Sequence, residues 1–186
     1  INSRLLLALS LLPKVGRQTI RKLLKANKQI LQPDIDLLQS LTGANNYRLL
    51  KNYLQSKGEL FEQVCTTAEV LHQLQINCIN YTDCDYPSLL LQTPDNPLLL
   101  FCKGDQKLLN RPQIAIVGSR QASASSLRHA YRFSRELAES GLVITSGLAR
   151  GIDGAAHSGA IDHNHPSIAV MGTGLDVVYP RAHQQM

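Results

Sequence analysis

Three short glycine-bearing turns are the residues of this chain best suited to holding an anion. The first is Gly118-Ser119-Arg120, the second is Ser146-Gly147 with Gly151 shortly after it, and the third contains Gly172 and Gly174. Backbone that lacks a Cβ can approach an anion closely, and a turn that leads into a helix adds free amides and a favourable dipole. The neighbouring hydroxyls and the guanidinium supply further donors. These turns therefore predict a site that holds phosphate.

The elements around the turns follow a repeating order. Each turn comes after a short apolar run, at residues 114–117, 142–144 and 167–171. An amphipathic segment at 123–140 separates the first two runs, and a helix rich in small residues at 152–161 separates the last two. Strand, turn and helix in this alternation predict a parallel α/β sheet, whose strand ends bind ligands at one edge. We predict a Rossmann-like, mostly parallel sheet with helices on both faces.

Two common nucleotide-binding motifs do not fit these turns. Residues 118–124 do not match GxGxxG, and no acidic residue follows about 20 positions later, which disfavours NAD. The chain has no GxxxxGK[ST] sequence, which disfavours a P-loop ATPase. We expect no cofactor.

The candidate catalytic and metal-binding groups have simpler structural readings. Asp153 and His157 are four residues apart and could pair for acid–base chemistry, but a capping aspartate with a packed histidine is favoured. His157, His163 and His165 have no acid or cysteine that completes a metal site. The serines of the turns lack a sequence-evident activating histidine. We therefore expect neither a metal nor catalytic residues.

Bulk composition indicates a globular protein without a membrane span. The chain has 186 residues, of which 44% are hydrophobic, and no window approaches the roughly 18 apolar residues that a span requires. Its four cysteines form no CxxC pair, so we expect reduced thiols and a cytoplasmic location. These cysteines are Cys65, Cys78, Cys84 and Cys102.

The N-terminal part is predicted to be a separate helical domain at residues 1–75, followed by a Rossmann-like domain at 76–186. Residues 1–33 carry seven basic side chains and no acidic one, which indicates a polyanionic partner or a solvated helix face. Residues 12–24 partly resemble a helix-hairpin-helix element, whose hairpin glycines approach DNA phosphates. Lys14 replaces the first of those glycines and Gly16 keeps the second. Lys14 and Arg17 are therefore candidate accessory DNA contacts, although such units also serve as packing modules.

Four segments together resemble the DNA-processing protein A family, DprA, also called Smf. They are IAIVGSR at 114–120, the sequence from 133 to 161 that contains SGLARGIDGAAH, residues 167–186, and residues 85–105. Residues 1–75 resemble, less specifically, the family's helical N-terminal domain of the SAM or helix-hairpin-helix type. The chain ends shortly after the YPRAH motif, so the resemblance implies that the Rossmann-like domain is incomplete at its C-terminus.

The resemblance implies a binding protein and not an enzyme. It implies single-stranded DNA as the ligand, a homodimer, and a role in loading the recombinase RecA during natural transformation. An alternative is a nucleotide-binding or nucleotide-cleaving enzyme of the related phosphoribohydrolase type, although no glutamate follows Gly174 within five residues as that family's motif requires. A third possibility is a protein-interaction module that uses the basic N-terminal helices.

Overall fold

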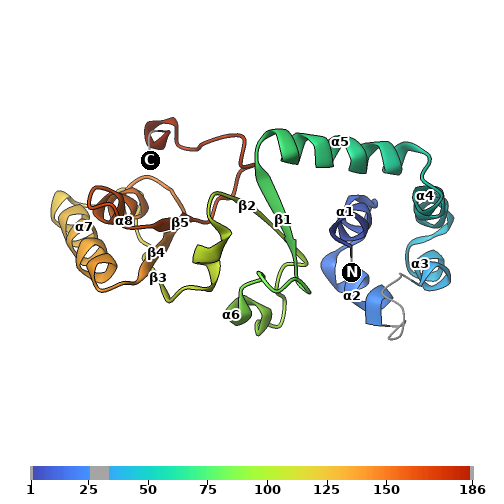
Figure 1. Ribbon diagram of the computed structural model, residues 1–186, viewed down its shortest axis with the longest axis horizontal. Helices are drawn as coiled ribbons and strands as arrows, with labels where there is room; N and C mark the ends of the chain where they lie inside the picture. The colour runs from blue at the N-terminus through green and yellow to red at the C-terminus, as the bar shows by residue number, and fades with distance from the viewer. Residues whose placement is uncertain (1, 26–33, 185–186) are drawn as a thin grey trace. The chain divides into compact units, whose positions relative to one another are not determined.

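A computed structural model of the protein describes residues 2–25 and 34–184 (Figure 1). The described chain divides into two compact units, Ile1–Gly104 and Asp105–Met186. Lys28, part of the basic N-terminal block, lies outside the described residues.

Five helices begin the first unit, in the part of the chain that was predicted to be helical. They are α1 (Ser3–Leu11), α2 (Arg17–Lys25), α3 (Ile35–Thr42), α4 (Ala44–Leu54) and α5 (Glu59–Gln73). Leu6, Leu9 and Leu23 are fully buried in a shared core that also contains Leu38 and Leu50. Helix α1 begins with a side-chain cap, because the Asn2 side-chain oxygen Oδ1 accepts from the Arg4 amide at 2.8 Å.

Two antiparallel strands belong to the same unit as these helices. They are β1 (Ile76–Asn80) and β2 (Leu99–Lys103), joined by a connector that contains α6 (Ser88–Leu91). Leu98 is buried in the helical core, and Tyr81 and Leu99 pack against it. Because the strands share this core, the compact units divide after Gly104, and the boundary predicted between residues 75 and 76 lies inside the first unit.

The second unit contains a three-stranded parallel sheet, as predicted. Its elements are β3 (Gln113–Ala115), α7 (Ala124–Glu139), β4 (Val143–Ser146), α8 (Ile152–Ile161) and β5 (Ser167–Ala169). The strand order is β3-β4-β5, with Ile114 opposite Ile144 and Ile144 opposite Ser167. Short 3-10 helices occupy Gln106–Asn110 and Arg181–His183.

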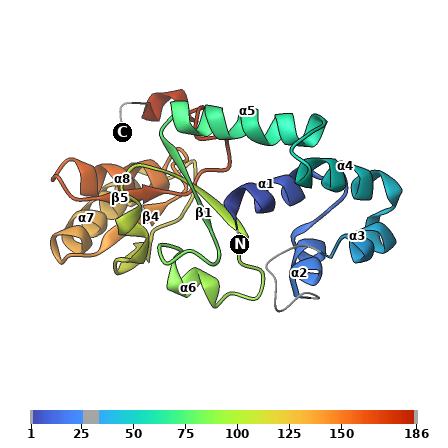
Figure 2. The same ribbon diagram turned by 45° about the vertical axis from the view of Figure 1, so that its right-hand side comes forward.

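Small residues let α8 approach its neighbours closely. Figures 1 and 2 both show α7 beside α8. A Cβ on Gly159 would overlap the Tyr131 carbonyl oxygen, and the Ser134 hydroxyl donates to the Ala156 carbonyl across this contact. Ala156 and Ala160 are fully buried with Ile144 in the unit's core. Both helices therefore pack on the face that carries Ile144.

The opposite face of this sheet differs in its exposure. Val117 and Val170 follow β3 and β5, alternate away from the Ile144 face, and are 76% and 63% exposed, whereas Val143 on the central strand alternates to the same side and is fully buried. Helices on both faces of the sheet were predicted. Among the described elements of this unit, α7 and α8 cover the face that carries Ile144, and helices on the other face stay a prediction.

Candidate functional site

The first two glycine turns lie side by side at the carboxyl edge of the sheet. The Ile152 amide, at the start of α8, donates to the Ser119 carbonyl at 3.2 Å. The Ser146 hydroxyl donates to the Ile116 carbonyl at 2.6 Å, and the Val170 amide donates to the Ser146 carbonyl at 2.8 Å. These bonds link the ends of all three strands, so the predicted adjacency of the turns is confirmed.

Two glycines make the contact between the first turn and α8 possible. A Cβ on Gly118 would lie 2.6 Å from Cγ1 of Ile152. Gly151 has φ of +83°, and a Cβ there would overlap the Ser119 carbonyl oxygen. Positive φ and so close an approach both exclude ordinary side chains. These two glycines shape the site because they let the backbone of the first turn lie against the start of α8.

The Gly118-Ser119-Arg120 turn presents its donors to solvent. All three residues are exposed. The Ser119 hydroxyl oxygen accepts from the Gln121 amide at 3.1 Å, which leaves the hydroxyl's own proton able to donate elsewhere. Among the salt bridges between described residues, none involves Arg120. The turn therefore offers an unneutralised guanidinium beside a hydroxyl donor.

The second turn uses its polar groups inside the protein. Ser146 is only 3% exposed, and its hydroxyl is bonded to β3. The carboxylate of Asp153, in the first turn of α8, accepts from the Gly147 amide at 3.2 Å and from the Ala149 amide at 3.4 Å. The geometry thus assigns Ser146 and Gly147 to holding the turn in shape, and their contact with a phosphate stays a prediction.

The expectation that Asp153 caps the N-terminus of α8 is wrong, because that helix has no side-chain cap. The aspartate is 8% exposed and lies two residues after Gly151, the residue that directly precedes α8. Its carboxylate bonds amides of the preceding loop, four and six residues back. Through its Oδ2 atom, Asp153 therefore fixes the loop between β4 and α8.

The third turn is exposed and closed by its own bonds. The Thr173 hydroxyl donates to the Val177 carbonyl, and the Val177 amide donates to the Gly174 carbonyl, each at 3.1 Å. Gly172 has open space around it, whereas Gly174 lies against the Asp176 carboxylate. A phosphate here would meet that negative charge, so Gly172 is the better placed of the two predicted glycines.

Two arginines near the second turn were missed by sequence reasoning. Arg150 is exposed and directly precedes Gly151. Arg181 is exposed and begins the 3-10 helix whose His183 Nδ1 bonds the Leu148 carbonyl at 3.0 Å, which brings that segment to the second turn. The available signal was compositional, because residues 111–186 contain arginine but no lysine. Arginine's planar fork suits phosphate oxygens.

His157 is a packed structural histidine, as expected. It is 2% exposed, and its Nδ1 donates to the Ser167 hydroxyl at 2.7 Å, which in turn donates to the Ile144 carbonyl at 2.9 Å. Burial lowers the pKa of His157 below its usual value, although the nearby Asp153 partly opposes this. The ring therefore favours its neutral form and ties α8 to β4 and β5.

No group of three or more histidine, cysteine or acidic side chains within residues 2–25 and 34–184 is placed to hold a metal. No helix in this part of the chain is long and apolar enough to cross a membrane. The four cysteines are free thiols.

The first unit contains the other predicted contacts, Lys14 and Arg17. Lys14 sits between α1 and α2 with φ of +59°, a left-handed conformation usual for glycine, at the position where the helix-hairpin-helix element has one. The Arg17 guanidinium forms a salt bridge with the Asp95 carboxylate at 3.0 Å. Among described residues Lys14 has no such partner. Lys14 is therefore the more available cation.

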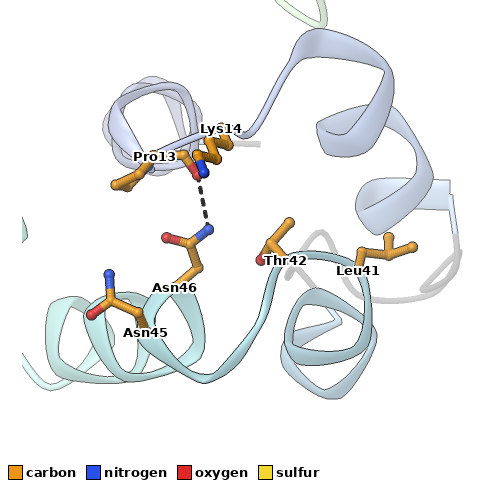
Figure 3. Close-up of a pocket in the computed structure, with 6 residues that line it drawn as sticks. All are labelled: Pro13, Lys14, Leu41, Thr42, Asn45 and Asn46. Carbon is orange, nitrogen blue, oxygen red and sulfur yellow. Dashed lines mark hydrogen bonds between the residues drawn. The ribbon is translucent and has the colours of Figure 1, made fainter.

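Lys14 borders an open pocket of about 390 Å³ (Figure 3). One side comes from the α1–α2 hairpin and the other from the α3–α4 junction, and the Asn46 side-chain amide donates to the Pro13 carbonyl between them at 3.0 Å. Gly43 precedes α4 without a side-chain cap, so the first amides of that helix face this region uncapped. The lining residues are Pro13, Lys14, Leu41, Thr42, Asn45 and Asn46.

Comparison with known proteins identifies the family. The family model described as DNA recombination-mediator protein A matches residues 77–186. The chain belongs to this family. The resemblance to DprA and Smf proteins is therefore confirmed.

Curated relatives of the DprA/Smf family match about half of the chain. Protein Smf of Escherichia coli is 48% identical over 101 residues, which is 54% of this chain and 27% of that protein. DNA processing protein DprA of Streptococcus pneumoniae is 47% identical over 104 residues, which is 56% of this chain and 36% of that protein. The matches thus span about a third or less of the length of these relatives.

Two solved DprA structures support the fold. The chain resembles the Streptococcus pneumoniae protein with a TM-score of 0.77 and 31% identity, over 100% of this chain and 62% of that one. It resembles the Helicobacter pylori protein, a structure that describes a single-stranded DNA binding mode, with a TM-score of 0.53 and 33% identity, over 60% and 49% of the two chains. The first match includes the helical N-terminal residues that precede the family model.

Proposed function

We propose that this chain binds single-stranded DNA at the carboxyl edge of its parallel sheet, through the Gly118-Ser119-Arg120 turn. The observation that carries the proposal is the exposed Arg120 guanidinium, which has no ion-pair partner among the described residues and lies beside an exposed hydroxyl. The Helicobacter pylori relative is described as binding single-stranded DNA, and this supports the same ligand here.

The proposed mechanism is capture of phosphate oxygens by charge-assisted hydrogen bonds. Arg120 offers a planar pair of donors, and Ser119 can donate its hydroxyl proton. Arg150 and Arg181 add positive potential near the neighbouring turn. Unpaired bases can then stack on guanidinium or aromatic groups, which favours single strands over duplex DNA.

The remaining predicted residues take different parts in this proposal. Gly151 and Gly147 hold the backbone geometry, and Ser146 ties β4 to β3. Gly172 is an open position where backbone can approach the strand, and Gly174 supports the same turn. Lys14 is an accessory DNA contact in the first unit, and Arg17 contributes less because Asp95 neutralises it.

For the whole protein we propose the role that the family resemblance implies. It would protect incoming single strands and help load the recombinase RecA in natural transformation and recombination, as a cytoplasmic homodimer without catalysis. The alternative phosphoribohydrolase activity predicts release of free base from nucleoside monophosphates. An assay that detects no such release, combined with oligonucleotide binding, would separate the two functions.

Replacing Arg120 by alanine should weaken binding to oligo-dT about tenfold, because one charge-assisted contact is lost. The slope of log affinity against log salt should become shallower by roughly 0.7, the value for one phosphate on a single strand. Fluorescence anisotropy across a salt titration measures both quantities.

Arg111→Ala is the matched control for this experiment. It removes the same charge from the same unit, but Arg111 precedes β3 and bonds the Gly141 carbonyl at the amino edge of the sheet. Equal weakening by both variants would indicate general electrostatic attraction and would contradict a site at the turn.

A further inference from the structure

Helix α7 carries an exposed aromatic side chain that packing does not explain. Phe133 is 62% exposed, whereas Ala130, Ser134 and Ala138 form the buried side of the helix. Burial of a phenylalanine side chain stabilises a fold, and this residue contributes little of that stabilisation where it stands. Around Phe133 lies a shallow hollow of about 150 Å³ that is also lined by His129, Arg132 and Glu136.

The residues beside Phe133 are mainly basic in the first half of the helix. Arg128, His129 and Arg132 precede the first acid of α7, which is Glu136. The Arg132 side chain is 68% exposed, and its only ion-pair partner among described residues is Glu136 at 4.0 Å. An exposed pair at that distance contributes little, so the guanidinium can exchange partners.

This surface lies on the helix that directly follows the first turn of the candidate site. Helix α7 begins at Ala124, four residues after Arg120, and Phe133 lies nine residues further along it. At 1.5 Å per residue that separation is about 14 Å. Positions 129, 132, 133 and 136 share one side of the helix because they are three or four residues apart. An extended polymer held at Arg120 can therefore reach Phe133 along a single helix.

We propose that this flank of α7 continues the path of single-stranded DNA that starts at the Gly118-Ser119-Arg120 turn. Phe133 provides a face on which a base stacks, and Arg128, His129 and Arg132 contact the adjacent phosphates. The charge of these side chains, the exposed aromatic ring and their place on the helix that follows the turn select a polyanion with exposed bases as the occupant. The inference rests on the proposed function and extends its site.

The test compares short and long oligo-dT on the complete chain. Phe133→Ala should leave binding of an oligomer of about 4 nucleotides unchanged and weaken binding of one of about 16 nucleotides fivefold or more, because one stacking contact is lost.

Glu136→Gln should strengthen binding of the long oligomer, because it removes a negative charge from the path. Leu89→Ala removes another exposed apolar side chain, 78% exposed on α6, and should change neither affinity.

The outcomes separate this inference from the proposed function. If Phe133→Ala binds the long oligomer like the parent while Arg120→Ala binds it weakly, the α7 path is wrong and the turn site stands. If the parent binds neither oligomer, both proposals fail. If Phe133→Ala instead changes the sedimentation coefficient of the free protein, the flank is a contact between copies of the chain and the α7 path is overturned.

Discussion

The two basic regions of the molecule differ in how much of their charge is free. In the first unit, Arg17 pairs with Asp95, and Arg21 donates to the carbonyl and side-chain oxygens of Asn96. At the sheet edge of the second unit, Arg120 and Arg150 have no ion-pair partner among the described residues. The N-terminal block is the most basic part of the sequence, but its Arg17 and Arg21 form bonds within their own unit. The arginines without an ion-pair partner belong to the second unit, whose sequence is less basic.

Local backbone accounts for part of this difference. The sheet edge brings three turns together through glycine contacts, which leave long side chains at its surface. In the first unit, the basic helix α2 lies against the connector at Asp95 and Asn96, whose oxygens attract its guanidinium groups. Net charge in a sequence window therefore overestimates the charge that a ligand can use.

The largest expected effect comes from the glycine contact that shapes the sheet edge. Gly151→Ala should lower the free energy of unfolding by about 3 kcal/mol, because alanine at φ of +83° is strained and its Cβ meets the Ser119 carbonyl. Urea titration followed by circular dichroism measures the change.

Gly172→Ala is the control, since nothing lies within 4 Å of its added Cβ, and it should shift the free energy of unfolding by less than about 0.5 kcal/mol. Similar losses in both variants would show that this contact does not stabilise the fold.

A smaller effect should distinguish the two cations of the first unit. Lys14→Ala should make the salt dependence of oligo-dT binding shallower by roughly 0.7, whereas Arg17→Ala should leave that slope nearly unchanged. Arg17→Ala should instead destabilise the protein by about 0.5 kcal/mol through loss of the Asp95 pair. The difference between the regions would disappear if Arg17→Ala reduced the slope as much as Arg120→Ala.

The smallest effect concerns His157 and the pH dependence of stability. Because the pKa of His157 is lowered in the folded protein, the unfolded chain binds more protons as the pH falls below about 6.5. The contribution of the neutral ring to the free energy of unfolding is complete above that pH. It is lost as the pH decreases towards the pKa of His157 in the folded protein. Urea midpoints between pH 8 and pH 5.5 should therefore fall more steeply for the parent than for His157→Gln. Parallel pH profiles would contradict the assignment.

Most of the fold and part of the site followed from local sequence. The helical character of the N-terminal residues was predicted, and the bounds of α8 matched the predicted segment 152–161. The adjacency of the first two turns followed from the parallel order. Strand β5 ends at Ala169, two residues before the predicted end, because the Val170 amide makes the last bond to β4 before the chain turns.

The use of individual polar groups could not be predicted in the same way. The Arg17 contact with Asp95 joins residues 78 positions apart, and the bonds from Asp153 to the second turn depend on how α8 docks. The segment that contains Arg181 is brought to that turn by the bond between His183 and Leu148. Such pairings depend on tertiary geometry, which periodicity and motif spacing do not encode.

The Asp153 carboxylate has a kinetic consequence for ligand capture. By accepting the Gly147 and Ala149 amides, it supplies the loop with a resident anion. The loop is thus ordered before any DNA arrives, and this segment loses little conformational entropy when DNA binds. We expect encounter to be governed by diffusion and charge, with association rates that fall as salt rises and a small heat-capacity change from loop ordering.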